Sequence, residues 1–151
     1  VCTNGKDQSE MLGAFLWGRK AECRLIDYSE MPDRIEIIAS HDGYTPVIHN
    51  RKFIFDRRSE LSIVDEIDNV NQLNKIQINY ILAPDCKVII EEKAIHITNN
   101  FARVKLIIES PDVKIRMRDL LYSAKYGREQ VTKGIVLETL SSNLSLQIIV
   151  E

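Results

Sequence analysis

The stretch Asn74-Lys-Ile-Gln-Ile-Asn-Tyr-Ile-Leu82 decides the fold class of this 151-residue chain. Its apolar side chains occupy every second position, and polar side chains fill the positions between them. The apolar set is Ile76, Ile78, Tyr80 and Leu82, and the polar set is Lys75, Gln77 and Asn79. Because successive side chains of a strand point to opposite faces, this pattern predicts a β-strand with one buried face and one solvated face.

The same two-residue period recurs through most of the chain after residue 20. It predicts further strands at 21–28, 33–40, 47–55, 61–67, 87–91, 94–98, 103–109, 113–118, 134–139 and 144–150. No stretch shows a helical period over three turns, and at most a short helical turn is expected at 65–73 or 119–124. About ten or more strands separated by turn residues predict an all-β fold, an antiparallel two-sheet β-sandwich forming a single domain over residues 1–151.

Composition narrows the possible partners and supports the sheet prediction. Lys and Arg total 20 and Asp and Glu total 22, for a formal net charge of −2. This balance lacks the basic excess typical of binding to nucleic acid or an anionic membrane, so neither partner is expected. No apolar run approaches the roughly 20 residues of a membrane-spanning helix. The three cysteines show no C-x-x-C spacing, and neither a metal site nor a cofactor is expected.

A polar cluster is predicted around the turn Asp42-Gly43-Tyr44-Thr45-Pro46. His41 and His49 flank this turn, and a hairpin there would bring both imidazoles to one rim of the sheet, close to Arg51. Two histidines and one aspartate around a loop are a weak metal signal. The alternative is a structural turn, in which Asp42-Gly43 shapes the backbone and Tyr44 packs at the corner.

Three stretches, taken together, resemble the heparinase II/III-like family. Residues 1–10, running on to Gly13-Ala-Phe-Leu-Trp-Gly-Arg-Lys-Ala21, are similar to its "DG-x-[DN]-Q" loop and following strand. Ala39-Ser-His-Asp-Gly-Tyr44 with His49-Asn-Arg51 resembles its "HDGY … H-x-R" strand pair, and Leu61-Ser-Ile-Val-Asp-Glu-Ile67 resembles the next strand. Asn4 departs from the family, which usually has Asp before the loop glycine.

The resemblance implies a polysaccharide lyase built from an α/α toroid followed by a β-sandwich. Such bacterial enzymes cleave uronic-acid-containing polysaccharide by β-elimination and are often periplasmic or secreted. The expectation is that this chain is the C-terminal sandwich without its toroid and is inactive alone. Its expected partners are acidic polysaccharide and the toroid, with self-association possible through an apolar patch at Phe15 and Trp17. The alternative is a non-catalytic glycan-binding or domain-docking module.

The resemblance also implies roles for individual residues. His41 is the candidate catalytic residue, in proton transfer, because the reference histidine pKa of about 6.5 lies near working pH. The candidate substrate-binding residues are Tyr44 by ring stacking, Arg51 through its bidentate fork, and His49, Asp7 and Gln8. The structural alternative is that His49 and Arg51 only bind Asp65 or Asp56 on a neighbouring strand.

Overall fold

The computed structural model describes residues 2–13, 15–57, 59–68 and 75–151. Within these residues the chain forms strands and no helix, and hence no helix that could cross a membrane. The strands are β1 (Cys2–Thr3), β2 (Met11–Gly13), β3 (Leu16–Trp17), β4 (Cys23–Glu30), β5 (Arg34–Tyr44), β6 (Val47–Asp56), β7 (Glu60–Asp68), β8 (Ile76–Ile81), β9 (Lys87–Glu91), β10 (Ala94–Thr98), β11 (Arg103–Ile108), β12 (Lys114–Lys125), β13 (Arg128–Thr139) and β14 (Asn143–Val150).

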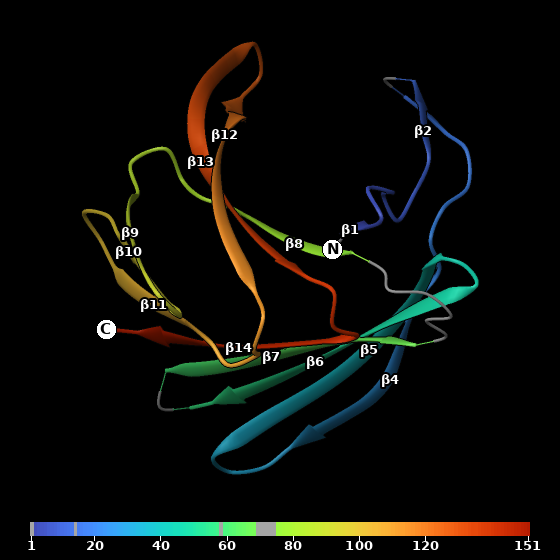
Figure 1. Cartoon of the computed structure of the whole chain (residues 1–151), viewed down its shortest axis with the longest axis horizontal. Helices are drawn as coiled ribbons and strands as arrows, with labels where there is room; N and C mark the ends of the chain where they lie inside the picture. Colours follow the sequence, from blue (N-terminus) through green and yellow to red (C-terminus); the bar gives the residue numbers. More distant parts are fainter. Residues whose placement is uncertain (1, 14, 58, 69–74) are drawn as a thin grey trace.

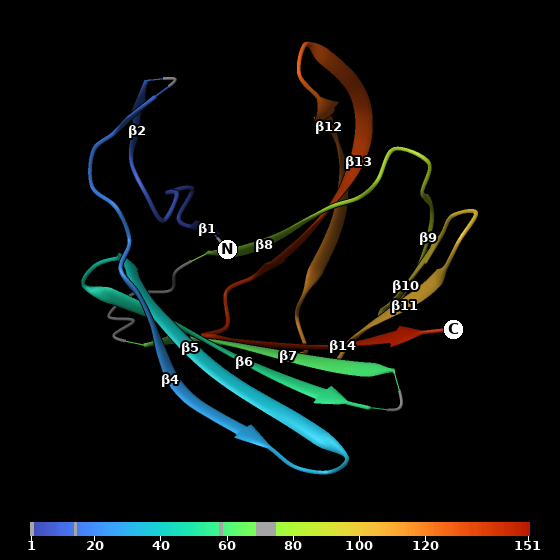
Figure 2. The ribbon, with the colours of Figure 1, turned by 180° about the vertical axis from the view of Figure 1, so that it is seen from behind.

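Two antiparallel sheets make the body of the molecule (Figures 1 and 2). The large sheet has eight strands in the order β4-β5-β6-β7-β14-β11-β10-β9, and the small sheet has four in the order β1-β8-β13-β12. β2 and β3 form a separate hairpin, which stands at the same side of the molecule as β4 and β5 (Figure 2). The predicted all-β antiparallel sandwich is confirmed.

The core lies between the two sheets and is built from the alternating apolar positions. Ile76 and Ile78 of β8 are fully buried, as the period predicts, and so are Ile135 and Leu137 of the adjacent β13. They share one cluster with side chains of the large sheet, among them Leu146 of β14. Full burial of one such side chain contributes about 1.5–3 kcal/mol, so this stripe holds the sheets together.

Most predicted strands are confirmed within a few residues, and the main differences concern hairpins. Residues 119–124 form no helical turn but continue β12, which pairs with β13 around Gly127 at φ 71°. The expected turn at 65–73 is wrong for 65–68, which end β7, and 69–73 lie outside the described residues. β5 continues through Gly43 to Tyr44 with an irregular register after His41, so the predicted loop shrinks to a tight turn.

Candidate functional site

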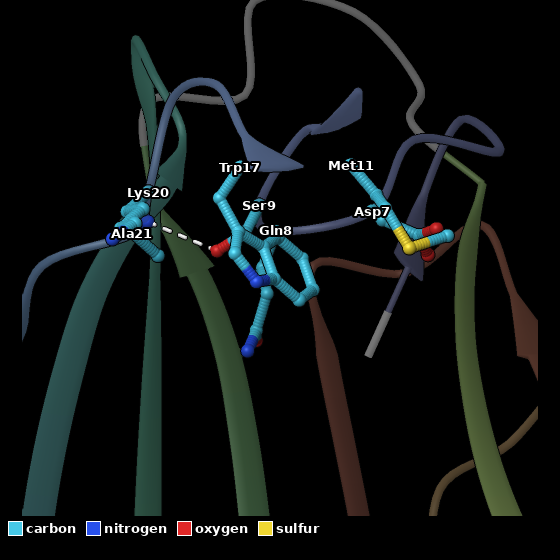
Figure 3. Close-up of a pocket in the computed structure, with 7 residues that line it drawn as sticks. All are labelled: Asp7, Gln8, Ser9, Met11, Trp17, Lys20 and Ala21. Carbon is cyan, nitrogen blue, oxygen red and sulfur yellow. Dashed lines mark hydrogen bonds between the residues drawn. The ribbon is translucent and has the colours of Figure 1, made fainter. Parts of the chain in front are cut away.

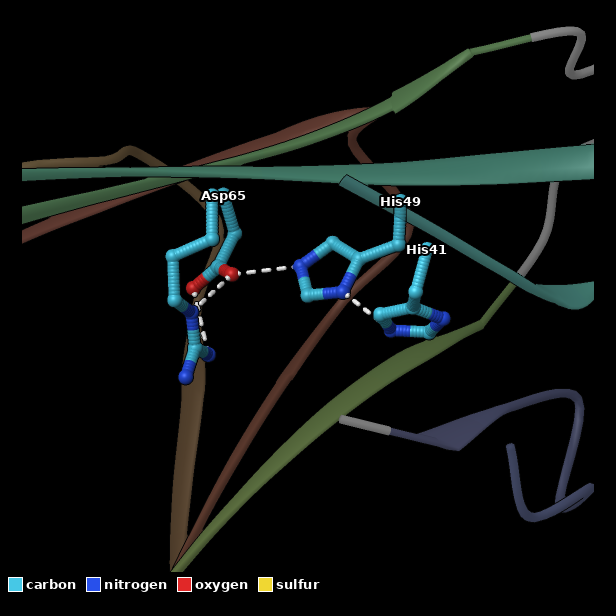
Figure 4. Close-up of polar contacts among 4 residues, drawn as sticks. His41, His49 and Asp65 are labelled. Carbon is cyan, nitrogen blue, oxygen red and sulfur yellow. Dashed lines mark hydrogen bonds and ion pairs between the residues drawn. The ribbon is translucent and has the colours of Figure 1, made fainter. Parts of the chain in front are cut away.

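Three neighbouring strands bring a chain of polar side chains together (Figure 4). His41 of β5 and His49 of β6 are directly paired across the hairpin, with 2.8 Å between His41 Nε2 and His49 Nδ1. The other ring nitrogen of His49, Nε2, lies 2.6 Å from Asp65 Oδ1 on β7. Asp65 is only 1% exposed, so its charge depends on these neighbours rather than on water.

The hydrogen bonds define in which direction protons are donated along the series His41, His49 and Asp65. The backbone N–H of Gly43 donates to His41 Nδ1 at 3.1 Å, which makes that nitrogen an acceptor. His41 therefore carries its proton on Nε2 and donates it to His49, and His49 in turn donates from Nε2 to Asp65. Both ring nitrogens of each histidine are thus occupied.

Burial sets the charge of His41, whereas hydrogen bonds set that of Asp65. Burial lowers the pKa of His41 to about 4, and electrostatic interactions with the neighbouring His49 and Arg51 side chains add to the effect. His41 is consequently a neutral imidazole at pH 7. Burial alone would raise the pKa of Asp65, but hydrogen bonds from His49 and Arg51 outweigh it and hold that pKa below its usual range. The hydrogen-bonded series therefore ends on Asp65 as an ionised carboxylate.

Arg51 binds the same carboxylate through two donors. Its Nε lies 2.7 Å from Asp65 Oδ1 and its Nη2 lies 3.0 Å from Asp65 Oδ2. The guanidinium also lies over the ring of Phe53, 5.8 Å from its centroid. Asp65 is therefore the carboxylate that both His49 and Arg51 contact, and the fork expected to receive a substrate anion is already engaged.

Tyr44 packs against this chain from the end of β5. Its ring centroid lies 5.3 Å from that of His41, and the residue is 8% exposed. Burial raises its pKa above the ordinary tyrosine value. A ring in this position presents little surface on which a sugar could stack.

The residues after β1 form a hollow of about 670 Å³ beside the β2–β3 hairpin (Figure 3). It is lined by Asp7, Gln8, Ser9, Met11, Trp17, Lys20 and Ala21, and we refer to it as the loop pocket. Ser9 Oγ accepts a hydrogen bond from the Ala21 backbone N–H at 3.1 Å, which joins the two ends of the pocket. Trp17 is the only tryptophan of the chain and is 51% exposed, so its ring is available to a ligand.

The structure brings the predicted residues into two adjacent groups. Asp7 and Gln8 lie in the loop pocket. His41, His49 and Arg51 belong with Asp65 to the hydrogen-bonded side chains that we call the polar chain, and Tyr44 packs against them. Gly43 joins the groups, because a Cβ at this position would lie 2.8 Å from both the Cβ and the carbonyl oxygen of Gln8. The loop thus rests directly on the backbone between His41 and Tyr44.

Trp17 and Lys20 also line the pocket, and the sequence pattern indicated a substrate role for neither of them. Trp17 was predicted only as part of an apolar patch, and Lys20 was not singled out. The available signal was the single tryptophan at position 17 and the two cations that follow it, Arg19 and Lys20, in a segment that is otherwise mostly apolar side chains and glycine. Among the described residues, no three His, Cys, Asp or Glu side chains converge as metal ligands.

Comparisons with known proteins identify one family for this chain. Residues 1–148 match the family model described as heparinase II/III-like, C-terminal, and no curated protein sequence gives a significant match. Heparan sulfate lyase HepC from Pedobacter heparinus has a similar structure, with a TM-score of 0.76 at 13% identity, over 87% of this chain and 22% of that one.

Two further solved structures are similar. The heparinase III-BT4657 gene product has a TM-score of 0.73 at 12% identity, over 85% of this chain and 21% of that one. A structure of heparinase III has a TM-score of 0.69 at 13% identity, over the same shares. At this identity the similarity shows the fold, and the chain spans about a fifth of the length of these enzymes.

Proposed function

The chain belongs to the heparinase II/III-like family as its C-terminal domain, and from this membership we propose that it serves a polysaccharide lyase that acts by β-elimination on uronic-acid-containing chains. The observation that carries the proposal is the loop pocket seated on the His41–Tyr44 hairpin. It places an exposed tryptophan and a lysine next to a chain of ordered proton donors and acceptors. A sugar bound in the loop pocket would therefore lie next to side chains that can accept and donate protons.

The loop pocket has the side chains that an acidic sugar requires. Trp17 offers an apolar ring face to a sugar ring. Lys20 offers a positive charge to a carboxylate or sulfate group, and Asp7 and Gln8 offer acceptors and donors to hydroxyl groups. We assign binding of the polysaccharide to these four residues.

β-Elimination requires three functions around one sugar residue. The uronate carboxylate must be neutralised so that the adjacent proton becomes acidic, a base must remove this proton, and an acid must protonate the leaving oxygen. His41 enters the proposal as proton acceptor, because its imidazole is neutral and its Nδ1 carries no proton. Its Nδ1 becomes available when the contact with Gly43 is exchanged for one with substrate.

The 151-residue chain alone is expected to cleave neither heparan sulfate nor alginate. The base, the acid and the group that neutralises the carboxylate must all contact the same sugar residue. This chain corresponds to only about a fifth of the length of the solved lyases that it resembles, so it is not expected to supply all three. The measurement is near-UV absorbance of unsaturated uronate, with an active lyase on the same substrates as a positive control. Release of this product above the level of a heat-denatured sample would contradict the prediction.

Trp17→Ala is expected to weaken binding of a heparan sulfate oligosaccharide about tenfold, because stacking of the sugar on the indole is lost. Isothermal titration calorimetry measures this change. The control is Phe101→Ala, which removes another exposed aromatic ring, in the turn between β10 and β11 and towards the end of the large sheet opposite β4. Equal affinity of Trp17→Ala and wild type would show that the pocket does not bind the sugar.

A docking role is the second candidate, and the exposed apolar surface of the β2–β3 hairpin favours it. Met11, Leu12, Leu16 and Trp17 are all more than half exposed, and Phe15 is 99% exposed. Apolar groups gathered in this way are typical of a surface that another domain covers. If the hairpin only docks, light scattering after size exclusion should show self-association while Trp17→Ala leaves glycan affinity unchanged.

A further inference from the structure

A buried carboxylate organises positive charge on the outer face of the small sheet. Glu138 of β13 is 5% exposed, although it lies on the face opposite the core. Arg116 Nη2 and Gln77 Nε2 donate hydrogen bonds to its oxygens, and Lys75 Nζ lies 2.8 Å from Oε1. Three donors from β12, β8 and the residue before β8 therefore converge on one side chain.

Glu138 is ionised under all ordinary conditions. The hydrogen bonds from Arg116 and Lys75 outweigh burial and lower its pKa to about 2. Arg116 and Lys75 are each about half exposed, so their remaining N–H groups reach solvent. The carboxylate thus fixes two cations in place while leaving them accessible, which reduces the entropy lost when they bind an anion.

Lys114 and Arg118 extend this group along β12. They flank Arg116 at two-residue spacing and so share its face, about 7 Å on either side. Ile115, between them, packs against the core. In the described part of the chain neither Lys114 nor Arg118 forms an ion pair. Their charges are therefore available to a ligand.

The face is hollowed next to these cations. A hollow of about 1030 Å³ is lined by Lys75, Lys114, Arg116 and Glu138, together with Asp112, the apolar Ile115 and residues 139–141. A smaller one, of about 250 Å³, is lined by Arg116, Arg118, Gln77 and Glu138. Four cations face two carboxylates here, a surplus of two positive charges in a chain whose net charge is −2.

The strand register connects this face to the loop pocket. Lys114 pairs with Glu138, Glu138 pairs with Gln77, and Gln77 pairs with Cys2 of β1. At about 4.8 Å between strands, this row is about 14 Å long. β1 lies at the opposite edge of the small sheet from β12, and the chain runs on from β1 to β2 (Figure 1). Residues 7–9, between these two strands, line the loop pocket.

We propose that the cationic face formed by Lys75, Lys114, Arg116 and Arg118 binds sulfate or carboxylate groups of an acidic polysaccharide whose chain continues into the loop pocket. The inference rests on the proposed function, because it takes the same ligand. Charge complementarity selects this ligand: repeated anions along one polymer match cations spaced along one strand.

The test compares two double variants of the 151-residue chain with the same loss of charge. Lys114→Ser/Arg118→Ser removes two cations of the face and leaves the contacts of Glu138 intact. Lys87→Ser/Arg103→Ser is the control, one lysine and one arginine on the large sheet. Calorimetry with a size-defined heparin-derived oligosaccharide should show about tenfold weaker binding for the first variant and no comparable loss for the control. An unsulfated uronate chain of equal length distinguishes sulfate from carboxylate recognition.

The outcomes separate this inference from the proposed function. Equal affinity of Lys114→Ser/Arg118→Ser and wild type, or an equal loss in the control, would overturn the cationic face. Fluorescence of the single tryptophan, Trp17, reports on the loop pocket alone. If the oligosaccharide leaves this fluorescence unchanged but the first variant still loses affinity, the pocket assignment fails and the cationic face stands as a separate anion-binding surface.

Discussion

Asp65→Asn is expected to lower the free energy of unfolding by about 3–5 kcal/mol, because it leaves the Arg51 guanidinium without its charged partner. Asp65 is 1% exposed and accepts hydrogen bonds from His49 and from two nitrogens of Arg51. An asparagine of the same shape keeps one acceptor and loses the charge. Urea unfolding followed by circular dichroism measures the change.

The matched control for this variant is Asp119→Asn. Asp119 also pairs with a cation, Lys133 at 2.5 Å, but both side chains are more than half exposed. An exposed pair contributes less than about 1 kcal/mol, so this variant should unfold close to wild type. A loss in Asp65→Asn no larger than in the control would show that the polar chain does not stabilise the sheet.

Gly43→Ala is expected to remove glycan binding at the loop pocket and to destabilise the protein by about 1–3 kcal/mol through overpacking. The added Cβ would lie 2.8 Å from the Gln8 carbonyl oxygen, a backbone atom that moves only if the loop moves. Displacing the loop shifts Asp7 and Gln8 away from Trp17. Calorimetry with the oligosaccharide and urea unfolding measure the two effects.

Gly127→Ala controls for the loss of a glycine. Gly127 has a φ of 71°, and a Cβ there would meet nothing within 4 Å. Its replacement costs about 1 kcal/mol of backbone strain but leaves the loop untouched, so glycan affinity should match wild type. Full glycan affinity in Gly43→Ala would refute the coupling between the loop and the hairpin.

The sequence predicted the strands because their signal is local. A two-residue period of apolar side chains holds along each strand whatever its neighbours are, and β8 and β14 match their predicted ranges closely. The pairing of His41 with His49 was also predictable, since two strands joined by a tight turn must lie side by side. The two-residue period did not predict the short strands β1 to β3, which are only two or three residues long.

The contacts that build the site are long-range, and only the tertiary structure decided them. The sequence left both Asp65 and Asp56 as partners of Arg51, and the register of β6 with β7 selected Asp65. Gln77 likewise donates a hydrogen bond to Glu138, which lies 61 residues away in the sequence. Strand order and register follow from how whole faces bury one another, which no single segment encodes. The sequence by itself therefore determined the strands and the family, while packing determined which charges meet.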